Sequence, residues 1–324
     1  MDMKTEIEIA MDLGSANAVL IHNNQTVVEE PTIIALDCKT NKTVALGEKA
    51  RQMQGKVHNS IIIAKPFREG VITSFADSEQ LIQGLLKKAV PDISPSSIKM
   101  VVSIPTCTTE VEIRALRSVL EKVGVNEVFM IKGPMAAALG IGVDVEKPKA
   151  CMIVDVGGGI TDIAVISLGG VVANRTINIG GDKFTKDLIK QIKKQHGFTV
   201  SENTAVLLKT NLGLCHSETS EGYNINDKLS VIPEEIALCV EKSISRIEES
   251  IMELFEETPP ELYHDLIESG IWLTGGGALL RGLDKRLSDK FGIKFQIVDD
   301  PLHAVAHGAN LVLKNLKKYS FLIN

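Results

Sequence analysis

The chain has 324 residues, enough for two domains of ordinary size that each bury a core. Hydrophobic residues make up 44% and charged residues 23%, a composition typical of globular proteins and not of disordered ones. The formal net charge of -6 argues against general nucleic-acid binding, because a phosphate backbone requires a basic surface.

The cysteines and the N-terminal segment predict a cytoplasmic protein. The five cysteines lie far apart and form no CxxC pair, so we expect neither a disulfide framework nor a zinc site. The opening MDMKTEIEIAMDLG carries acidic residues where a secretory signal needs a basic start. No stretch approaches the roughly 18 to 20 apolar residues of a membrane span.

Two segments of the sequence, called openings below because each begins one half of the chain, share the same pattern of apolar run, turn and second apolar run. An apolar run at residues 7–13 leads into DLGSAN at 12–17, and a second apolar run at 18–21 precedes a polar turn. The same order returns at residues 150–154, followed by DVGGGITD at 155–162, another apolar run and a glycine turn. Each opening predicts a strand, a tight turn and a strand. We therefore expect two related lobes.

Helix-like and strand-like stretches alternate around these openings. Residues 100–104 form a buried-strand run, and residues 110–123 have apolar side chains at three- and four-residue spacing with Gly124 beyond the end. The alternation predicts an α/β fold. Further helices are expected at 183–195, 233–255, 279–290 and 302–317.

The glycine-rich turns carry the chemical signal. A glycine turn after a buried strand lets backbone N–H groups approach phosphate oxygens, because no β-carbon obstructs them. Asp12 and Asp155 end the two leading strands, where a carboxylate can hold Mg²⁺ directly or through its waters. A third glycine run at 275–277 suits a flat ligand, or an anion at a helix N-terminus. Neither the Rossmann GxGxxG pattern nor the Walker pattern fits these turns.

Three such turns in this order resemble the actin, sugar-kinase and heat-shock-ATPase superfamily. Within it the chain is similar to the MreB family of bacterial actin homologues over nearly its whole length. Residues 12–17 match that family's DLGTAN, and VDVGGGITD at 154–162 matches its VDIGGGTTE. Further matches follow in the same order along the chain at 66–72, 109–112, 134–138, 166–170, Gly181-Asp182, 273–280, 300–302, Ala306 and Gly308.

The resemblance implies an actin-like ATPase fold, with two related ribonuclease-H-like lobes around a nucleotide cleft and a small subdomain inserted in each. Lobe I would comprise residues 1–145 plus about 308–324, with its insert at about 32–75. Lobe II would comprise residues 146–307, with its insert at about 183–245.

The resemblance also implies ATP or ADP with Mg²⁺ as the cofactor, and self-assembly into filaments. Asp12 and Asp155 would hold the magnesium ion through water. Lys209 matches a lysine near the nucleoside, although residues 206–208 are apolar here where the family has acidic residues. The other implied nucleotide contacts are Ser15, Ala16 and Asn17 in the first turn, Gly157, Gly158 and Gly159 in the second, Gly181 and Asp182, and Gly275, Gly276, Gly277 and Ala278 on the adenosine side.

The departure from the family pattern that matters most lies directly before Pro134. The family has Ile-Glu-Glu before Pro-Met-Ala-Ala-Ala, and its glutamate next to the proline resembles the group that orients the attacking water. Here the sequence is Ile131-Lys132-Gly133. Loss of a water-holding group commonly costs about two to four decades in rate, so we expect slow hydrolysis with Thr161 and Asp162 as residual water-positioning groups. Alternatively, another residue supplies the water contact.

These features favour an ATP-binding cytoskeletal filament protein that acts in cell shape or motility. The alternative is a nucleotide-binding regulator that co-assembles with a more active relative of the same family. A small-molecule kinase is disfavoured, because no aspartate is placed to deprotonate a substrate hydroxyl. A heat-shock-type chaperone would need a peptide-binding domain after the ATPase lobes.

Peripheral contact with the inner face of the cell membrane is a further expectation from the family. Residues 311–324 mix lysines with bulky apolar side chains, as a membrane-surface helix does, but a helix packed on the first lobe with a frayed tail is favoured. In the segment 92–97 only Ile93 is bulky and apolar, so insertion there would be weak. His303 and His307 lack the glutamate of HExxH, so no zinc site is expected.

Overall fold

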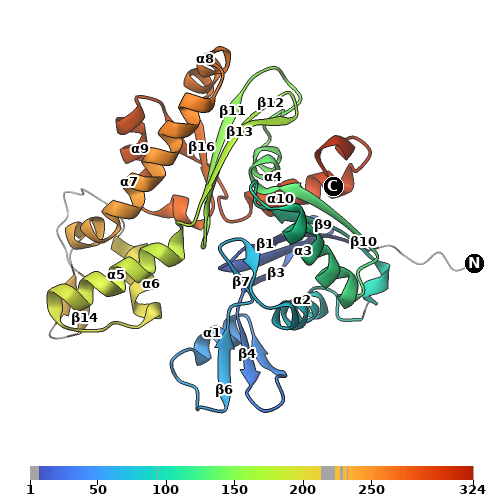
Figure 1. Ribbon diagram of the computed structural model, residues 1–324, viewed down its shortest axis with the longest axis vertical. Helices are drawn as coiled ribbons and strands as arrows, with labels where there is room; N and C mark the ends of the chain where they lie inside the picture. Colours follow the sequence, from blue (N-terminus) through green and yellow to red (C-terminus); the bar gives the residue numbers. More distant parts are fainter. Residues whose placement is uncertain (1–6, 93, 213–222, 227–228, 232, 324) are drawn as a thin grey trace, which may run out of the picture. The chain divides into compact units, whose positions relative to one another are not determined.

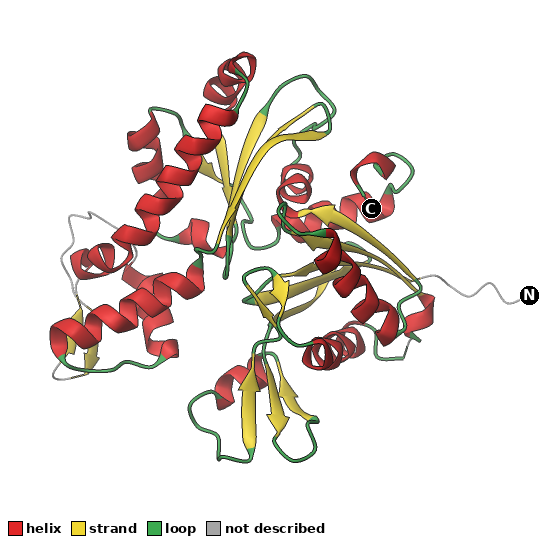
Figure 2. Ribbon diagram, in the orientation of Figure 1, coloured by secondary structure: helices red, strands yellow, loops and turns green. Residues whose placement is uncertain are grey.

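The computed structural model describes residues 7–92, 94–212, 223–226, 229–231 and 233–323. The chain divides into two compact units, the first comprising Met1–Val145 with His303–Asn324 and the second Glu146–Leu302. Each unit contains a central sheet with helices packed against it (Figures 1 and 2). The lobe and insert limits that the resemblance implies stay predictions.

The first unit is built on five strands: β1 (Ile7–Leu13), β2 (Asn17–His22), β3 (Gln25–Pro31), β9 (Ile98–Ile104) and β10 (Glu127–Lys132). Their order is β10-β9-β1-β2-β3, with β1, β9 and β10 parallel and β1, β2 and β3 antiparallel. Asn23 and Asn24 turn β2 into β3 at φ angles of 51° and 62°, which asparagine tolerates better than most residues. The predicted strand at 7–13 is confirmed.

Helices cover both faces of this sheet: α2 (Phe75–Ala89), α3 (Glu110–Val123), α4 (Gly133–Gly140) and α10 (Ala304–Lys314). Alternate strand residues such as Ile9 and Met11 join α2 and α3 in the main core, because successive side chains point to opposite faces. Helices α4 and α10 pack on each other, and α10 packs on β1 and β9 from the other face. The predicted helix at 110–123 is confirmed; it begins at a Thr109–Glu112 capping box.

A small subdomain is inserted between β3 and α2. It contains β4 (Ile34–Asp37), β5 (Thr43–Leu46), α1 (Glu48–Met53) and β6 (Ile61–Ala64), with a small core of its own. Glu30 fastens it: its carboxylate accepts a hydrogen bond from the backbone N–H of Glu48 at 2.6 Å and pairs with Lys88 of α2. A hairpin of β7 (Phe67–Arg68) and β8 (Val71–Ile72) leads back to the main sheet.

The second unit repeats this strand order. Its sheet runs β13-β12-β11-β16-β17, with β11, β12 and β13 antiparallel and β11, β16 and β17 parallel. Strand β11 therefore occupies the place that β1 has in the first unit, as the two similar openings predict. The strands are β11 (Cys151–Val156), β12 (Thr161–Ser167), β13 (Gly170–Ile177), β16 (Ile271–Thr274) and β17 (Phe295–Ile297).

Five helices accompany this sheet in the described part of the second unit: α5 (Gly181–His196), α6 (Glu202–Leu212), α7 (Pro233–Glu257), α8 (Pro260–Ser269) and α9 (Leu283–Phe291). Their apolar faces follow the helical period; Val240, Ile244, Ile247 and Ile251 of α7 are all buried in the core. The short strands β14 (Tyr223–Asn226) and β15 (Leu229–Val231) pair with each other.

Two expected helices have different limits in the structure. The helix expected from residue 279 begins only at Leu283, because Gly282 adopts a left-handed φ of 84° and separates it from a short 3-10 turn at Gly276–Leu279. The helix expected at 302–317 spans Ala304–Lys314. The chain then makes turns, a 3-10 turn at Ser320–Leu322, and a bridge from Ile323 to Ile131.

The C-terminal residues therefore form no continuous membrane-surface helix. Ile93, named above for the other membrane segment, lies outside the described residues. No helix in the described ranges combines the length and the apolar character that crossing a membrane requires.

Replacing Gly308 by alanine tests the crossing of α4 and α10. A β-carbon at Gly308 would lie closer than 3.0 Å to backbone atoms of Ala136, so we expect Gly308→Ala to destabilise the protein by about 3 kcal/mol. At an ordinary helical site this substitution stabilises by about 1 kcal/mol. Gly133→Ala is the control, since its β-carbon would lie 3.6 Å from the Ile104 carbonyl. Chemical denaturation measures both; equal stability of the two variants would contradict the packing argument.

Candidate functional site

The first glycine turn follows β1 and is fixed by backbone hydrogen bonds. The N–H of Gly14 donates to the carbonyl of Asn17 at 3.0 Å, and a β-carbon on Gly14 would fall 2.9 Å from that same oxygen. Thr32 brackets the turn, donating from its backbone N–H to Ala16 and from its hydroxyl to Gly14, each at 2.8 Å. The turn is therefore tight, and the Asn17 side chain is exposed beside it.

Ser15 and Asp12 are both held by neighbours within the first unit. The Ser15 hydroxyl accepts a hydrogen bond from the Gly70 N–H at 3.0 Å. The Ser103 hydroxyl donates to Asp12 Oδ1 at 2.5 Å. Burial raises the pKa of Asp12, while the Ser103 hydrogen bond and the charge of His303 oppose that rise. A cation bound beside Asp12 would also oppose the rise in its pKa, because it would stabilise the ionised carboxylate.

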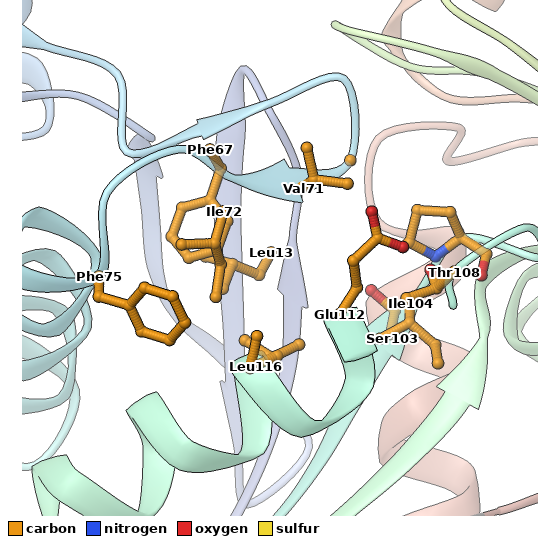
Figure 3. Close-up of a pocket in the computed structure, with 13 residues that line it drawn as sticks. Leu13, Phe67, Val71, Ile72, Phe75, Ser103, Ile104, Thr108, Glu112 and Leu116 are labelled. Atoms are coloured by element: carbon orange, nitrogen blue, oxygen red, sulfur yellow. Dashed lines mark hydrogen bonds between the residues drawn. The ribbon is translucent and has the colours of Figure 1, made fainter. Parts of the chain in front are cut away.

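A cavity of about 170 Å³ lies beside this turn, within the first unit. Figure 3 shows Phe67, Ile72 and Phe75 gathered at one end of it and Ser103 and Glu112 at the other. The cavity is therefore mainly apolar and reaches Ser103, whose hydroxyl donates to Asp12.

The departure at Ile131-Lys132-Gly133 lies where β10 passes into α4. Gly133 is buried and is the first residue of α4, and it has no polar side chain. The Lys132 amine donates to the carbonyl oxygens of Thr106 at 3.0 Å and Pro105 at 3.4 Å. Lys132 therefore fastens the loop that follows β9.

The second glycine turn is built against the start of α5. The N–H of Gly157 donates to the carbonyl of Ile160 at 2.9 Å. The N–H groups of Gly181 and Asp182 donate to the carbonyls of Gly157 at 3.0 Å and Gly158 at 2.8 Å. Because these two N–H groups already donate to the turn, any nucleotide contact of Gly181 or Asp182 would have to use other atoms.

Asp155 and Asp162 face each other across β11 and β12. The Asp162 carboxylate is 2% exposed and accepts a hydrogen bond from the Thr176 hydroxyl at 2.7 Å. Thr161 is 0% exposed, and its hydroxyl donates to the Ile179 carbonyl at 2.7 Å. A direct contact of Thr161 or Asp162 with a catalytic water would need this strand to rearrange, so their catalytic role stays a prediction.

The third glycine turn rests on the end of β11. Gly275 has a φ of 78°, and its N–H donates to the Pro301 carbonyl at 2.8 Å. A β-carbon at Gly275 would lie 2.5 Å from the carbonyl oxygen of Val156, and one at Gly277 would lie 2.8 Å from it. Glycine is thus required here by packing, whether or not a ligand is bound. Ala278 is fully buried, and its expected contact with the adenosine stays a prediction.

Lys209 of α6 binds protein groups in this structure. Its amine donates to the Gly181 carbonyl at 2.9 Å and to the Thr185 hydroxyl at 3.1 Å, which joins α6 to the first turn of α5. The expected nucleoside contact of Lys209 therefore stays a prediction.

Three supporting residues were missed by sequence reasoning: Thr32, Ser103 and Thr176. Ser103 gave one usable signal, because it is a polar residue near the end of an apolar strand run. Thr32 lies in the bend after β3 and Thr176 lies in β13, and nothing in the sequence relates either residue to the turn that it supports. His303 and His307 lie with ring centroids 6.1 Å apart, and no metal-binding group of three or more ligand side chains occurs among the described residues.

Each unit supplies groups that fit a magnesium-bound nucleotide. Both leading strands end in a tight turn with bare backbone, where a β-carbon on Gly14 or Gly157 would lie 2.9 Å or 3.2 Å from a carbonyl of the same turn. Both also present an aspartate, Asp12 or Asp155, whose oxygens are the hard ligands that Mg²⁺ prefers.

Comparison with known proteins identifies the family of the chain. The sequence model of the MreB/Mbl protein family matches residues 6–321. The chain belongs to the MreB/Mbl family. It is 35% identical over 323 residues to the cell shape-determining protein Mbl of Bacillus cereus, covering 96% of this chain and 97% of that one. It is also 35% identical over 324 residues to the cell shape-determining protein MreB of Escherichia coli, covering 95% and 93%.

Solved structures of relatives have the same fold. The chain matches MreB5 of Spiroplasma citri bound to AMPPNP with a TM-score of 0.91 and 32% identity, over 98% of both chains. The ADP-bound form of that protein gives a TM-score of 0.90 at 32% identity, over 98% of this chain and 99% of that one. A MamK double helical filament matches at 0.78 and 19% identity, over 96% and 99%, which shows the fold alone. This MreB/Mbl family member therefore has the actin-like fold.

Asp12→Asn tests the buried carboxylate. Because the pKa of Asp12 is raised in the folded chain, the folded state binds more protons than the unfolded state as pH rises above about 4, and stability falls with pH. Asp12→Asn removes this loss, so we expect a higher melting temperature at pH 7 without nucleotide or Mg²⁺. Below the ordinary carboxylate pKa the difference should vanish.

Asp37→Asn is the matched control of opposite sign. Hydrogen bonds from Thr40 and Lys39 lower the pKa of the exposed Asp37 carboxylate, so its removal should lower the melting temperature at pH 7. Differential scanning fluorimetry from pH 4 to pH 8 measures both variants. A lower melting temperature for Asp12→Asn at pH 7 would contradict the assignment.

Proposed function

We propose that this MreB/Mbl family member binds ATP and ADP with Mg²⁺ and polymerises into cytoskeletal filaments that act in cell shape or motility. The observation that carries the proposal is the pair of equivalent turns after β1 and β11, each with an aspartate at the strand end. Support comes from the likeness over nearly the full chain to MreB5 of Spiroplasma citri, whose structures contain AMPPNP and ADP.

Within this proposal the first and second turns bind the phosphates, and the third turn lies beside the adenosine. Ser15, Ala16 and Asn17 act through the first turn, and Gly157 to Gly159 through the second. Asp12 and Asp155 hold Mg²⁺ through its waters. Gly181 and Asp182 stabilise the second turn, a role that the hydrogen bonds of their N–H groups support. Lys209 lies on the nucleoside side and also joins α6 to α5.

Hydrolysis in this proposal is slow. ATP hydrolysis depends on orienting one water in line with the terminal phosphate, and Gly133 has no side chain for that purpose. Slow hydrolysis prolongs the triphosphate-bound state, which would favour the assembled filament. The role in cell shape is supported by the names of the relatives as cell shape-determining proteins, and filament formation is inferred from the family resemblance. A cytoplasmic location with peripheral membrane contact belongs to the proposal as well.

Gly133→Glu tests the account of slow hydrolysis. We expect phosphate release at saturating Mg-ATP to rise at least about tenfold, because a carboxylate beside Pro134 can hold the attacking water. Gly133→Ala, which adds a β-carbon without a carboxylate, should leave the rate unchanged. If the wild type already hydrolyses ATP as fast as a relative with the intact glutamate, another residue holds the water.

Sedimentation separates the filament from the regulator. The proposal expects the purified chain to pellet by itself with Mg-ATP and to stay in solution when EDTA removes the Mg²⁺. A chain that pellets only when mixed with a more active MreB relative would instead be a regulator of that relative's filaments.

A further inference from the structure

Lys132 lies at the carboxyl ends of the parallel strands of the first sheet, which is where ligands bind in folds of this kind. Strands β1, β9 and β10 are parallel, and Lys132 ends β10 in register with Ile104 of β9. The first glycine turn begins at the same edge, directly after β1. In open α/β sheets, ligands bind outside the carboxyl ends of the parallel strands. Two strand spacings separate β10 from β1, roughly 10 Å, part of which the lysine stem can span.

The charge of Lys132 faces neutral protein groups. Its amine contacts the Thr106 and Pro105 carbonyls, and among the described residues no carboxylate lies within ion-pair distance of it. The opposite ends of the same two strands differ, since Lys99 pairs there with Glu127 at 3.2 Å. A half-buried ammonium without a counter-charge favours an anionic partner.

The start of helix α4 adds positive potential at Lys132. Helix α4 begins at Gly133, and the side chain at its N-cap position, Lys132, makes no capping hydrogen bond. The N-terminal end of a helix carries a partial positive charge. Gly133 has no carboxylate that could neutralise the Lys132 amine. Space for a side chain is not the reason, because a β-carbon at Gly133 would lie 3.6 Å from the Ile104 carbonyl oxygen, an ordinary contact.

We propose that the ammonium of Lys132 binds the terminal phosphate of a nucleoside triphosphate and thereby makes the chain prefer the triphosphate over the diphosphate. This inference rests on the proposed nucleotide binding. An ammonium has three donors, and the two carbonyl contacts use two of them, so one donor is left for a phosphate oxygen. A diphosphate ends one phosphate short and loses this contact. Like slow hydrolysis, this preference increases the fraction of the protein that is bound to the triphosphate.

The test compares the affinities of the full-length chain for Mg-AMPPNP and Mg-ADP. For Lys132→Met we expect affinity for AMPPNP to fall about tenfold and affinity for ADP to change less than about twofold, because one charge-assisted hydrogen bond is lost from the triphosphate alone. Lys132→Arg keeps the charge and should stay within about threefold of the wild type for both. Lys149→Met, which removes a lysine paired with Glu268 on the other unit, is the matched control.

A second measurement uses the wild-type chain, so it does not depend on the folding of a variant. Acetylation of the Lys132 amine, followed by peptide mass spectrometry, should be slowed by Mg-AMPPNP and not by Mg-ADP. Equal protection by both nucleotides, or an unchanged affinity ratio in Lys132→Met, would overturn the inference while leaving nucleotide binding intact. Protection by inorganic phosphate alone would make this a free-phosphate site and overturn it too. If the wild type binds neither nucleotide, the proposed function fails and the inference with it.

Discussion

The first unit depends on one close helix crossing. Helices α4 and α10 meet at Gly140 and Gly308, where a β-carbon on either glycine would overlap the backbone of the other helix. This contact joins the end of the chain to the strand β10 and helix α4 that carry Lys132 and Gly133, and α10 also lies along β1. Packed cores resist small displacements, so the crossing fixes where those residues lie relative to Asp12.

In the second unit, glycine residues allow the turns to pack closely on neighbouring backbone. Gly180 packs against the carbonyl of Gly157, and Gly275 and Gly277 pack against the end of β11, at distances that a β-carbon would not allow. Gly157, Gly275 and Gly277 follow strand ends and are partly exposed, so close packing and ligand approach place the same demand on the sequence. Their presence alone therefore cannot separate a structural role from a binding role.

Local signals in the sequence predicted the elements, and tertiary contacts decided the details of the site. The run at 7–13 and the capped helix at 110–123 formed as expected, because each carries its own periodicity and end signals. The hydrogen bonds of Thr161 with Ile179 and of Lys209 with Gly181 join residues 18 and 28 positions apart. Such pairings depend on how α5 and α6 pack, which no local pattern encodes. The alternation of residues along a strand indicates on which face of the sheet a side chain lies, but it does not indicate the hydrogen-bond partner of that side chain.

The proposed function requires the three glycine turns to contact the same bound nucleotide. Hydrogen exchange followed by mass spectrometry, with and without Mg-ATP, tests it most directly, because bound phosphates and adenosine restrict opening of the backbone they touch. The account predicts slower exchange at residues 12–17, 156–160 and 274–278 together, and loss of that protection when EDTA removes Mg²⁺. Protection of one turn alone, or no change in any of the three, would contradict it.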